Sequence, residues 1–186
     1  MVLKYQICQQ IGGNINSYFL ALISKEKGSS SFDRFKLISL CNIGYKIITK
    51  FIANKIKELL PSIVPENQGG FVKGIHIANN IILVQEEIHS SIQHREKGMI
   101  IKLDLANAFD RVIYDFLFRV ILRFGFGPYF IRWIQACIKS PWISPLVNGQ
   151  AANLFQASRG LRQGFLLSPL LYVIQASVLS FHLNIC

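Results

Sequence analysis

The sequence predicts a mixed α+β fold, in which a small sheet packs against amphipathic helices. The apolar run at residues 99–103, interrupted only by Lys102, is short for a helix and is expected to be a buried strand. Apolar residues between 43 and 60 recur with helical spacing. Turn-forming residues at 24–31 and at 148–149 each separate two β-prone runs, which indicates two hairpins.

Composition indicates a globular, basic protein. The chain has 186 residues, 51% of them hydrophobic, and a formal net charge of +10, which suits one domain or part of a larger one. This charge favours an anionic partner, with nucleic acid ahead of an acidic membrane surface. The four cysteines are scattered without a C-x-x-C pair, so neither a zinc site nor a disulfide framework is indicated, and a reducing compartment fits.

The elements follow in order along the chain. A hairpin and two helices are predicted in the N-terminal half, at residues 18–23, 35–40, 43–60 and 81–92. The C-terminal half is predicted to hold the central strand, two helices, a second hairpin and a final helix, at residues 99–103, 112–123, 129–139, 142–148, 152–157 and 165–186. The first long helix is expected to stop before Pro61, and Ser168-Pro169 is expected to start the last one as N-cap and N1.

The final helix is the only membrane suspect. Its polar residues make it unsuitable for spanning a bilayer, so it is expected to be buried within the protein. No secretory signal is visible at the N-terminus. We therefore expect an intracellular protein, nuclear or cytoplasmic.

Asp104 follows the central strand directly. A carboxylate there is a candidate ligand for Mg²⁺, although an Asp at a strand end more often caps the next turn. Phe109 and a second acid, Asp110, come five and six residues later. The spacing alone favours the cap, because one Asp makes no metal site.

Two other stretches carry candidate phosphate contacts. In residues 158–169, S-R-G-L-R-Q-G-F-L-L-S-P, two glycines allow close backbone approach, and Arg159 and Arg162 offer contacts to phosphate. Lys25 and Lys36 lie near two strand ends around one loop. The alternative for residues 158–169 is a charged surface turn, and the alternative for the loop near Lys25 and Lys36 is an ordinary solvated loop.

Taken together, four motifs resemble non-LTR (LINE-type) retrotransposon reverse transcriptases, especially those common in plants. They are L-I-S-K with F-K-L-I-S-L-C-N, then N-Q-G-G-F-V-K-G, D-L-A-N-A-F-D-R-V, and S-R-G-L-R-Q-G with S-P, in the family's order between about residues 14 and 180. Several positions depart from the family pattern. Lys36 and Ile75 each replace an Arg, Leu37 replaces a Pro, and Phe165-Leu166 replaces Asp-Pro.

This resemblance implies a partial right-hand polymerase fold, with fingers at about residues 14–98 and part of the palm at 99–186. The activity it implies is RNA-directed DNA polymerisation from dNTPs on an RNA template and a DNA primer with Mg²⁺; no particular protein partner is implied. By the same resemblance, Asp104 is the catalytic metal ligand and Phe109 the steric gate against ribonucleotides. Lys25 and Lys36 are triphosphate contacts, and Gln163 and Gly164 are template or nucleotide contacts.

One family motif is missing. The Y/F-A-D-D motif, which would lie beyond Cys186, supplies the remaining carboxylates, and the sequence contains no Asp-Asp pair. Two-metal nucleotidyl transfer needs several carboxylates, so we expect this chain to be inactive on its own. Two alternatives to a truncated reverse transcriptase domain stay open: a non-catalytic basic module that binds RNA or DNA, and a decayed fragment without function.

The missing motif also predicts exposed apolar surface. The central strand would lack a neighbour on one side, which invites edge-to-edge association. The final helix would lack part of its covering surface, leaving Leu170, Leu171, Val173 and Ile174 partly exposed.

Overall fold

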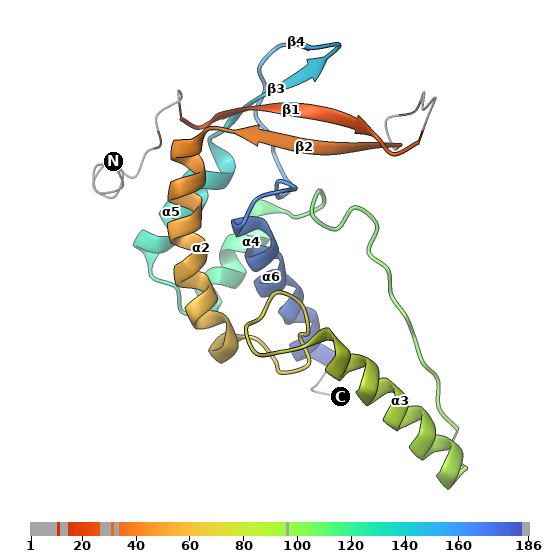
Figure 1. The fold of residues 1–186 in the computed structure, drawn as a ribbon. Coiled ribbons are helices and arrows are strands. Elements are labelled where there is room, and N and C mark those ends of the chain that lie inside the picture. The colour runs from red at the N-terminus through yellow and green to blue at the C-terminus, as the bar shows by residue number, and fades with distance from the viewer. Residues whose placement is uncertain (1–10, 12–14, 27–30, 32–33, 96, 184–186) are drawn as a thin grey trace.

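The protein has a small sheet, a group of helices beneath it, and one arm that extends away from both (Figure 1). The arm consists of residues 77–94 and 97–105. The computed structural model describes residues 11, 15–26, 31, 34–95 and 97–183. In chain order its elements are β1 Ser17–Ser24, β2 Phe35–Cys41, α2 Ile43–Ile63, α3 Ile77–His94, α4 Tyr114–Arg123, α5 Pro128–Lys139, β3 Trp142–Val147, β4 Gln150–Ala151 and α6 Leu167–Leu183. The predicted α+β class is confirmed.

The sheet has the strand order β2-β1-β3-β4. β1 pairs antiparallel with β2, as the first predicted hairpin requires, and parallel with β3. The parallel pair joins segments more than 100 residues apart, and the helices of the crossover lie below the sheet. The β1–β2 loop falls partly outside the described residues.

The second hairpin is shorter than predicted. β4 comprises only Gln150–Ala151, just before the returning strand predicted at residues 152–157, and an isolated bridge from Phe155 to Ile143 stands in place of that predicted strand. Pro145 explains the break, because it has no N–H to donate toward β4. The Ala152 carbonyl accepts instead from the Ser144 hydroxyl at 2.7 Å.

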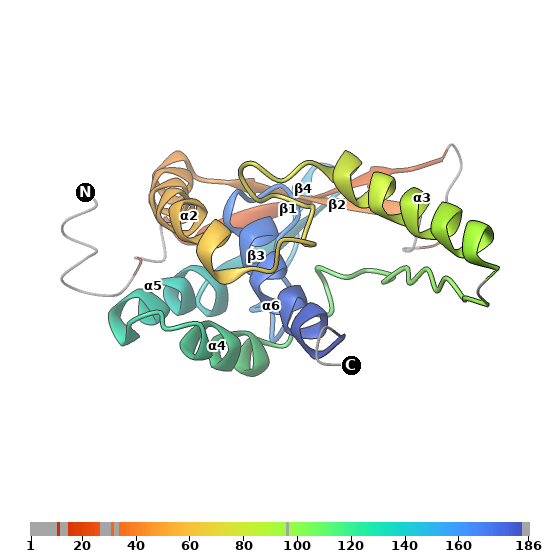
Figure 2. The same ribbon diagram turned by 90° about the horizontal axis from the view of Figure 1, so that it is seen from below.

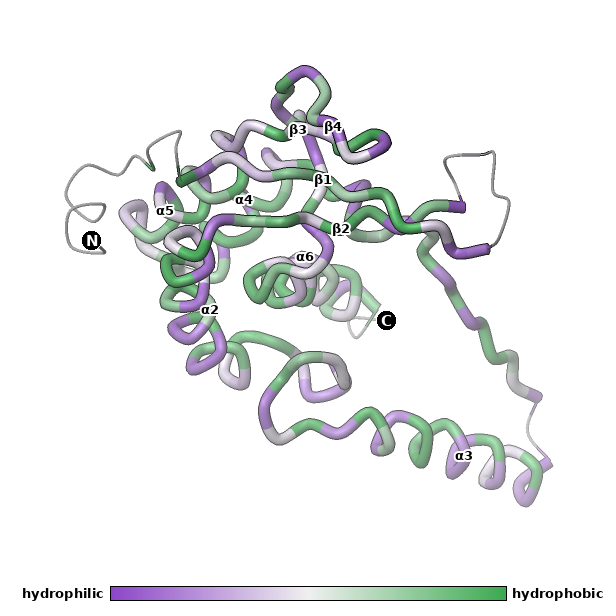
Figure 3. The backbone as a smooth tube through the Cα atoms, turned by 45° about the horizontal axis from the view of Figure 1, so that its top comes forward, coloured by the Kyte–Doolittle hydropathy of each residue, from purple (hydrophilic) through white to green (hydrophobic). Residues whose placement is uncertain are grey.

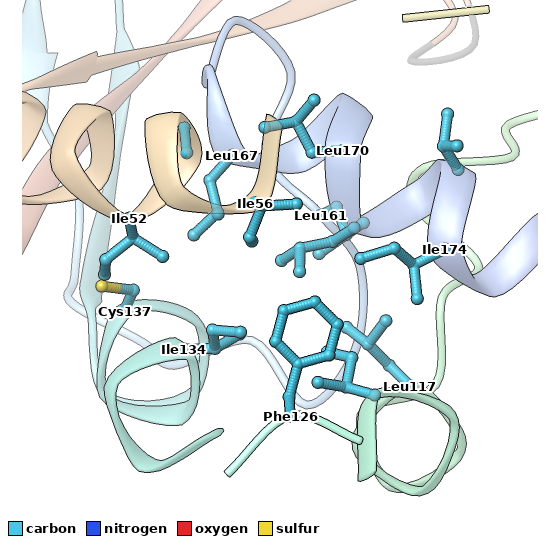
Figure 4. Packing of buried hydrophobic residues seen from close by; sticks show 14 of the residues in the cluster. Ile52, Ile56, Leu117, Phe126, Ile134, Cys137, Leu161, Leu167, Leu170 and Ile174 are labelled. Carbon is cyan, nitrogen blue, oxygen red and sulfur yellow. The ribbon is translucent and has the colours of Figure 1, made fainter. Parts of the chain in front are cut away.

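The hydrophobic core lies among α2, α4, α5 and α6. The predicted helical spacing in α2 is confirmed, and Ile48, Ile52, Ile56 and Leu60 are buried along one face. Figure 4 shows side chains of this cluster converging from the four helices. The predicted stop before Pro61 is wrong, since α2 continues to Ile63. Pro61 cannot donate to the Lys57 carbonyl and its ring crowds that carbonyl, but only two helical residues follow it, so little of the helix is affected.

Helix α6 lies in the centre of the core, where Figure 3 shows it as a largely hydrophobic segment. The expected partial exposure of Leu170, Leu171, Val173 and Ile174 is wrong, because α2 and α4 pack on the helix and these four side chains are buried. Nearer its C-terminal end, Leu179, Phe181 and Leu183 are exposed. It begins at Leu167, so Ser168 lies inside its first turn and is not the N-cap. Among the described helices, this one included, none is both long and apolar enough to cross a bilayer.

The predicted central strand does not form. Residues 97–105, which we call the open segment, run from the end of α3 toward α4 without regular secondary structure (Figures 1 and 2). In this segment Met99, Ile101 and Leu103 are 82%, 67% and 70% exposed. None of the four strands reaches this segment, so it has no ladder partner among the described residues. Helix α3 is present as predicted, but it buries none of its residues.

Candidate nucleic-acid interface

Two of the motifs selected from the sequence lie side by side. Gly160 N–H donates to the Val112 carbonyl and Leu161 N–H to the Phe109 carbonyl, both at 2.8 Å. We call this contact between residues 107–112 and 158–164 the junction. It joins the segment that follows Asp104 to the S-R-G-L-R-Q-G motif, 50 residues later.

Gly160 makes the junction possible. Its φ is +94°, a left-handed conformation that residues with a Cβ rarely adopt. An added Cβ would lie 3.1 Å from the Asp110 carbonyl oxygen, so a larger residue would also push the two segments apart. The Tyr114 hydroxyl donates to the Gly160 carbonyl at 3.1 Å, so both the N–H and the carbonyl of this glycine are hydrogen-bonded.

A cavity of about 210 Å³ opens at the junction, between the β1–β2 hairpin and residues 157–163. Its lining includes Tyr18, Ser39, Asp110, Tyr114, Arg159, Arg162 and Gln163. The structure therefore brings together three residues predicted from the S-R-G-L-R-Q-G motif. Sequence reasoning missed the others; Asp110 had a signal, as the acid that closes the D-L-A-N-A-F-D stretch, whereas Tyr18 had none.

The cavity walls change the acidity of two groups. Partial desolvation raises the pKa of the Asp110 carboxyl above its ordinary value. Burial raises the pKa of the Tyr114 hydroxyl to about 12, although the positive charge of Arg162 works in the opposite direction. Both groups thus favour their neutral forms more than they do in water.

Arg162 lies among aromatic rings. Its guanidinium carbon is 4.4 Å from the ring centroid of Tyr18, 5.0 Å from that of Tyr45 and 5.1 Å from that of Phe165. An Nη atom donates to the Cys137 carbonyl at 3.0 Å. These contacts hold the half-buried arginine against the core, a packing role that its predicted phosphate contact did not include.

Phe165 belongs to this aromatic group. It stands where the family pattern has Asp, and its ring is buried at 5.1 Å from the ring of Tyr45. A large apolar ring here provides a face for the Arg162 guanidinium. Arg159, in contrast, is exposed and has no hydrogen bond or ion pair with any other described residue, which leaves its charge available to a ligand.

Gly164 and two lysines border a second hollow. This space of about 300 Å³ lies between β2 and the start of α2, and Lys46, Lys50 and Gly164 are among its lining residues. Together with Arg159 at the first cavity, it gives the 158–166 loop a basic group on each side.

Lys25 and Lys36 lie at the far end of the β1–β2 hairpin. Lys25 N–H donates to the Arg34 carbonyl at 2.8 Å, and Lys36 pairs with Ile23 across the hairpin. Lys36 is three residues beyond Ser39, about 10 Å along an extended strand. Neither lysine lines the cavity, so the structure does not bring these predicted contacts into it.

Phe109 is half-buried at the junction. Its ring lies 5.0 Å from that of Tyr172 on α6, with the planes tilted by 34°. The Phe109 side chain, the predicted gate, therefore packs against the core, and the Phe109 carbonyl accepts a hydrogen bond from the Leu161 N–H.

Asp104 is exposed on the open segment and does not border the cavity. In the part of the chain that the structure describes, no three His, Cys, Asp or Glu side chains gather closely enough to hold a metal ion. A single solvent-exposed carboxylate does not match the set of oxygen ligands that Mg²⁺ requires. The described residues thus do not by themselves fit a divalent-metal centre.

Comparison with known proteins decides the family. A family model described as "Reverse transcriptase (RNA-dependent DNA polymerase)" matches residues 23–185. The chain belongs to the reverse transcriptase family. This confirms the predicted membership and connects both sides of the junction to the reverse transcriptase domain.

Three relatives show how much of a longer protein the chain matches. It is 28% identical over 153 residues, 82% of the chain, to the "Transposon TX1 uncharacterized 149 kDa protein" of Xenopus laevis. It is 25% identical over 154 residues, 80% of the chain, to the "Probable RNA-directed DNA polymerase from transposon BS" of Drosophila melanogaster. Identity is 27% over 105 residues, 56% of the chain, with the R2DM Pol polyprotein of the same fly. The matched parts span 12%, 16% and 10% of those proteins.

Proposed function

We propose that this chain forms the fingers, at about residues 14–98, and part of the palm, at 99–186, of a right-hand polymerase fold. In this proposal it binds an RNA template and DNA primer for RNA-directed DNA synthesis. The observation that carries it is the junction, where residues 107–112 and 158–164 of a reverse transcriptase meet beside a cavity.

The charges around the junction support binding to a nucleic-acid backbone. The chain has 20 Lys and Arg against 10 Asp and Glu, and Arg159, Lys46 and Lys50 lie around the 158–166 loop. Basic side chains that meet phosphates supply most sequence-independent affinity for nucleic acids. We assign Arg159 to phosphate contact, and Arg162 to holding the loop in place with its remaining surface available to phosphate.

The other predicted residues keep, in this proposal, the roles that the family resemblance implies. Gln163 borders the first cavity and Gly164 the second, where each can contact a template base or an incoming nucleotide. Phe109, held by Tyr172, is proposed as the gate against a ribose 2′-hydroxyl. Lys25 and Lys36, at the hairpin end, are proposed contacts for the triphosphate of a dNTP.

Two-metal catalysis requires more acids at one site than the described residues bring together. Asp104 is proposed as one ligand for Mg²⁺ in a complete reverse transcriptase, but a two-metal centre also needs carboxylates that the described residues lack. We therefore expect the 186-residue chain to bind a primer–template without extending it. Extension above background with Mg²⁺ or Mn²⁺ that disappears in Asp104→Ala would contradict this expectation.

A binding experiment tests the proposed interface. Fluorescence anisotropy with a labelled RNA–DNA primer–template, repeated at several salt concentrations, should show affinity that falls steeply with salt. Arg159→Ala should weaken binding and reduce the salt slope by about one unit, because one phosphate contact is lost.

The matched control is Arg123→Ala. It removes the same charge from the other end of α4, away from the junction, and should change binding less. Equal effects of the two substitutions, or affinity that does not change with salt, would refute the interface.

A further inference from the structure

The arm consists of α3 and the open segment at residues 97–105, and both parts expose apolar side chains. Met99, Ile101, Leu103 and Leu105 alternate along the open segment and are each at least 60% exposed. Within the described residues, no backbone hydrogen bond involves 99–105. An extended apolar segment with unpaired N–H and C=O groups is a template for pairing with another strand.

The sequence of this segment is complementary to itself in one antiparallel register. With Leu103 opposite Leu103 of a second copy, Ile101 faces Leu105 on one side of the paired strands. On the other side Lys102 faces Asp104, and the two-fold symmetry makes this opposite-charge pair twice. Both side chains are exposed and have no ion-pair partner among the described residues, so both are available.

Neighbouring registers are less favourable. A shift that places Lys102 at the two-fold axis puts like charges directly opposite each other, and a shift to Asp104 does the same. A slip by one residue pairs the apolar side with the charged one. Parallel in-register pairing would align Lys102 with Lys102. Charge and alternation together therefore select the Leu103-centred register.

A two-strand ribbon needs a cover to be stable in water. Helix α3, the helical part of the arm, carries a stripe of exposed apolar side chains along one face. They are Ile77, Ile81, Val84, Ile88 and Ile92. In a pair of copies, one such helix from each would cover the side of the ribbon formed by Ile101, Leu103 and Leu105.

We propose that the arm is a self-association surface, through which two copies of this chain pair antiparallel along residues 101–105 about a two-fold axis at Leu103. This inference goes beyond the proposed function, since it concerns the chain without nucleic acid. It also predicts that pairing covers Asp104, because its carboxylate then contacts Lys102 of the second copy.

Reversal of the two charges tests the register. Sedimentation velocity over a dilution series of the full chain should show a concentration-dependent dimer. Lys102→Glu and Asp104→Lys should each raise the dimer dissociation constant about tenfold, because two attractive pairs become repulsive. The double variant, with both charges exchanged, should return to the wild-type value.

Net charge provides an independent control. Lys102→Glu lowers the positive charge of the chain, which by general repulsion alone would strengthen association, so weakening is specific to the register. Lys73→Glu makes the same change in the exposed loop before α3 and should not weaken the dimer. A monomer at all concentrations, single variants that associate like the wild type, or a double variant as weak as the singles would each overturn the proposal.

Discussion

Replacing Arg162 by Met should destabilise the protein by about 2 kcal/mol. Arg162→Met keeps an apolar stem in place and removes the guanidinium, with its contacts to three rings and to the Cys137 carbonyl. A hydrogen bond from a charged donor is worth about 1.5–3 kcal/mol. Cation–π contacts add roughly 0.5–2 kcal/mol, and relief from the cost of desolvating a half-buried charge offsets part of the total.

The Cys137 carbonyl limits the loss. It also accepts from the Tyr45 hydroxyl at 2.5 Å, so removing Arg162 does not leave a buried acceptor without a donor. For a protein of this size, about 2 kcal/mol corresponds to a fall in melting temperature of about 4–8 °C.

Urea unfolding followed by circular dichroism measures this difference by linear extrapolation. Arg159→Met is the matched control, since that exposed side chain has no partner among the described residues, and its effect should stay within about 0.5 kcal/mol. Arg162→Lys should recover only part of the stability, because an ammonium lacks the planar fork that stacks on rings.

An Arg162→Met protein that unfolds within about 0.5 kcal/mol of the wild type would refute the reasoning, because it would show that the ring contacts contribute little. A second readout is spectroscopic. Arg162 lowers the pKa of Tyr18 against the larger raising effect of burial, so the variant should ionise this tyrosine at higher pH.

Three further predictions concern the junction and the core. Gly160→Ala should destabilise the protein more than Gly164→Ala in urea melts: both have positive φ, but only at Gly160 would the new Cβ meet backbone, and equal losses would contradict the close approach. Stability should fall as pH rises from about 9 to 12, because the folded state keeps protons on Cys137 and Tyr114, whose pKa values are raised by burial to about 12, while the unfolded chain releases them from ordinary values of 9.0 and 10.0. Urea midpoints across this range check the sign, and Tyr114→Phe should flatten the upper part of the curve. The Cys137 thiol should resist alkylation in the native protein at neutral pH and react once the chain unfolds, as peptide mass spectrometry would show.

Local pattern predicted much of the secondary structure. The spacing of Ile48, Ile52 and Ile56 defines the buried face of α2, and β-prone runs on either side of a loop define β1 and β2. These features depend on interactions between residues close in sequence, or on the period of a single element, so they can be derived without a fold. The motifs on both sides of the junction likewise predicted the family, and the structure shows that Arg159, Arg162 and Gln163 of one motif line a common cavity.

The tertiary structure decided which apolar segments are buried and what each charged side chain contacts. Residues 99–103 and α6 are both apolar in sequence, yet the first is exposed and the second lies at the centre of the core. The reason is that a strand needs a partner for its backbone, which the described residues do not supply to 99–103, whereas α6 satisfies its own backbone and needs only the apolar faces of α2 and α4. Arg162 and Arg159 are three residues apart and alike in sequence. Only the fold surrounds Arg162 with Tyr18, Tyr45 and Phe165, residues as far apart as 147 positions in the chain, because long-range packing places side chains that no local pattern connects.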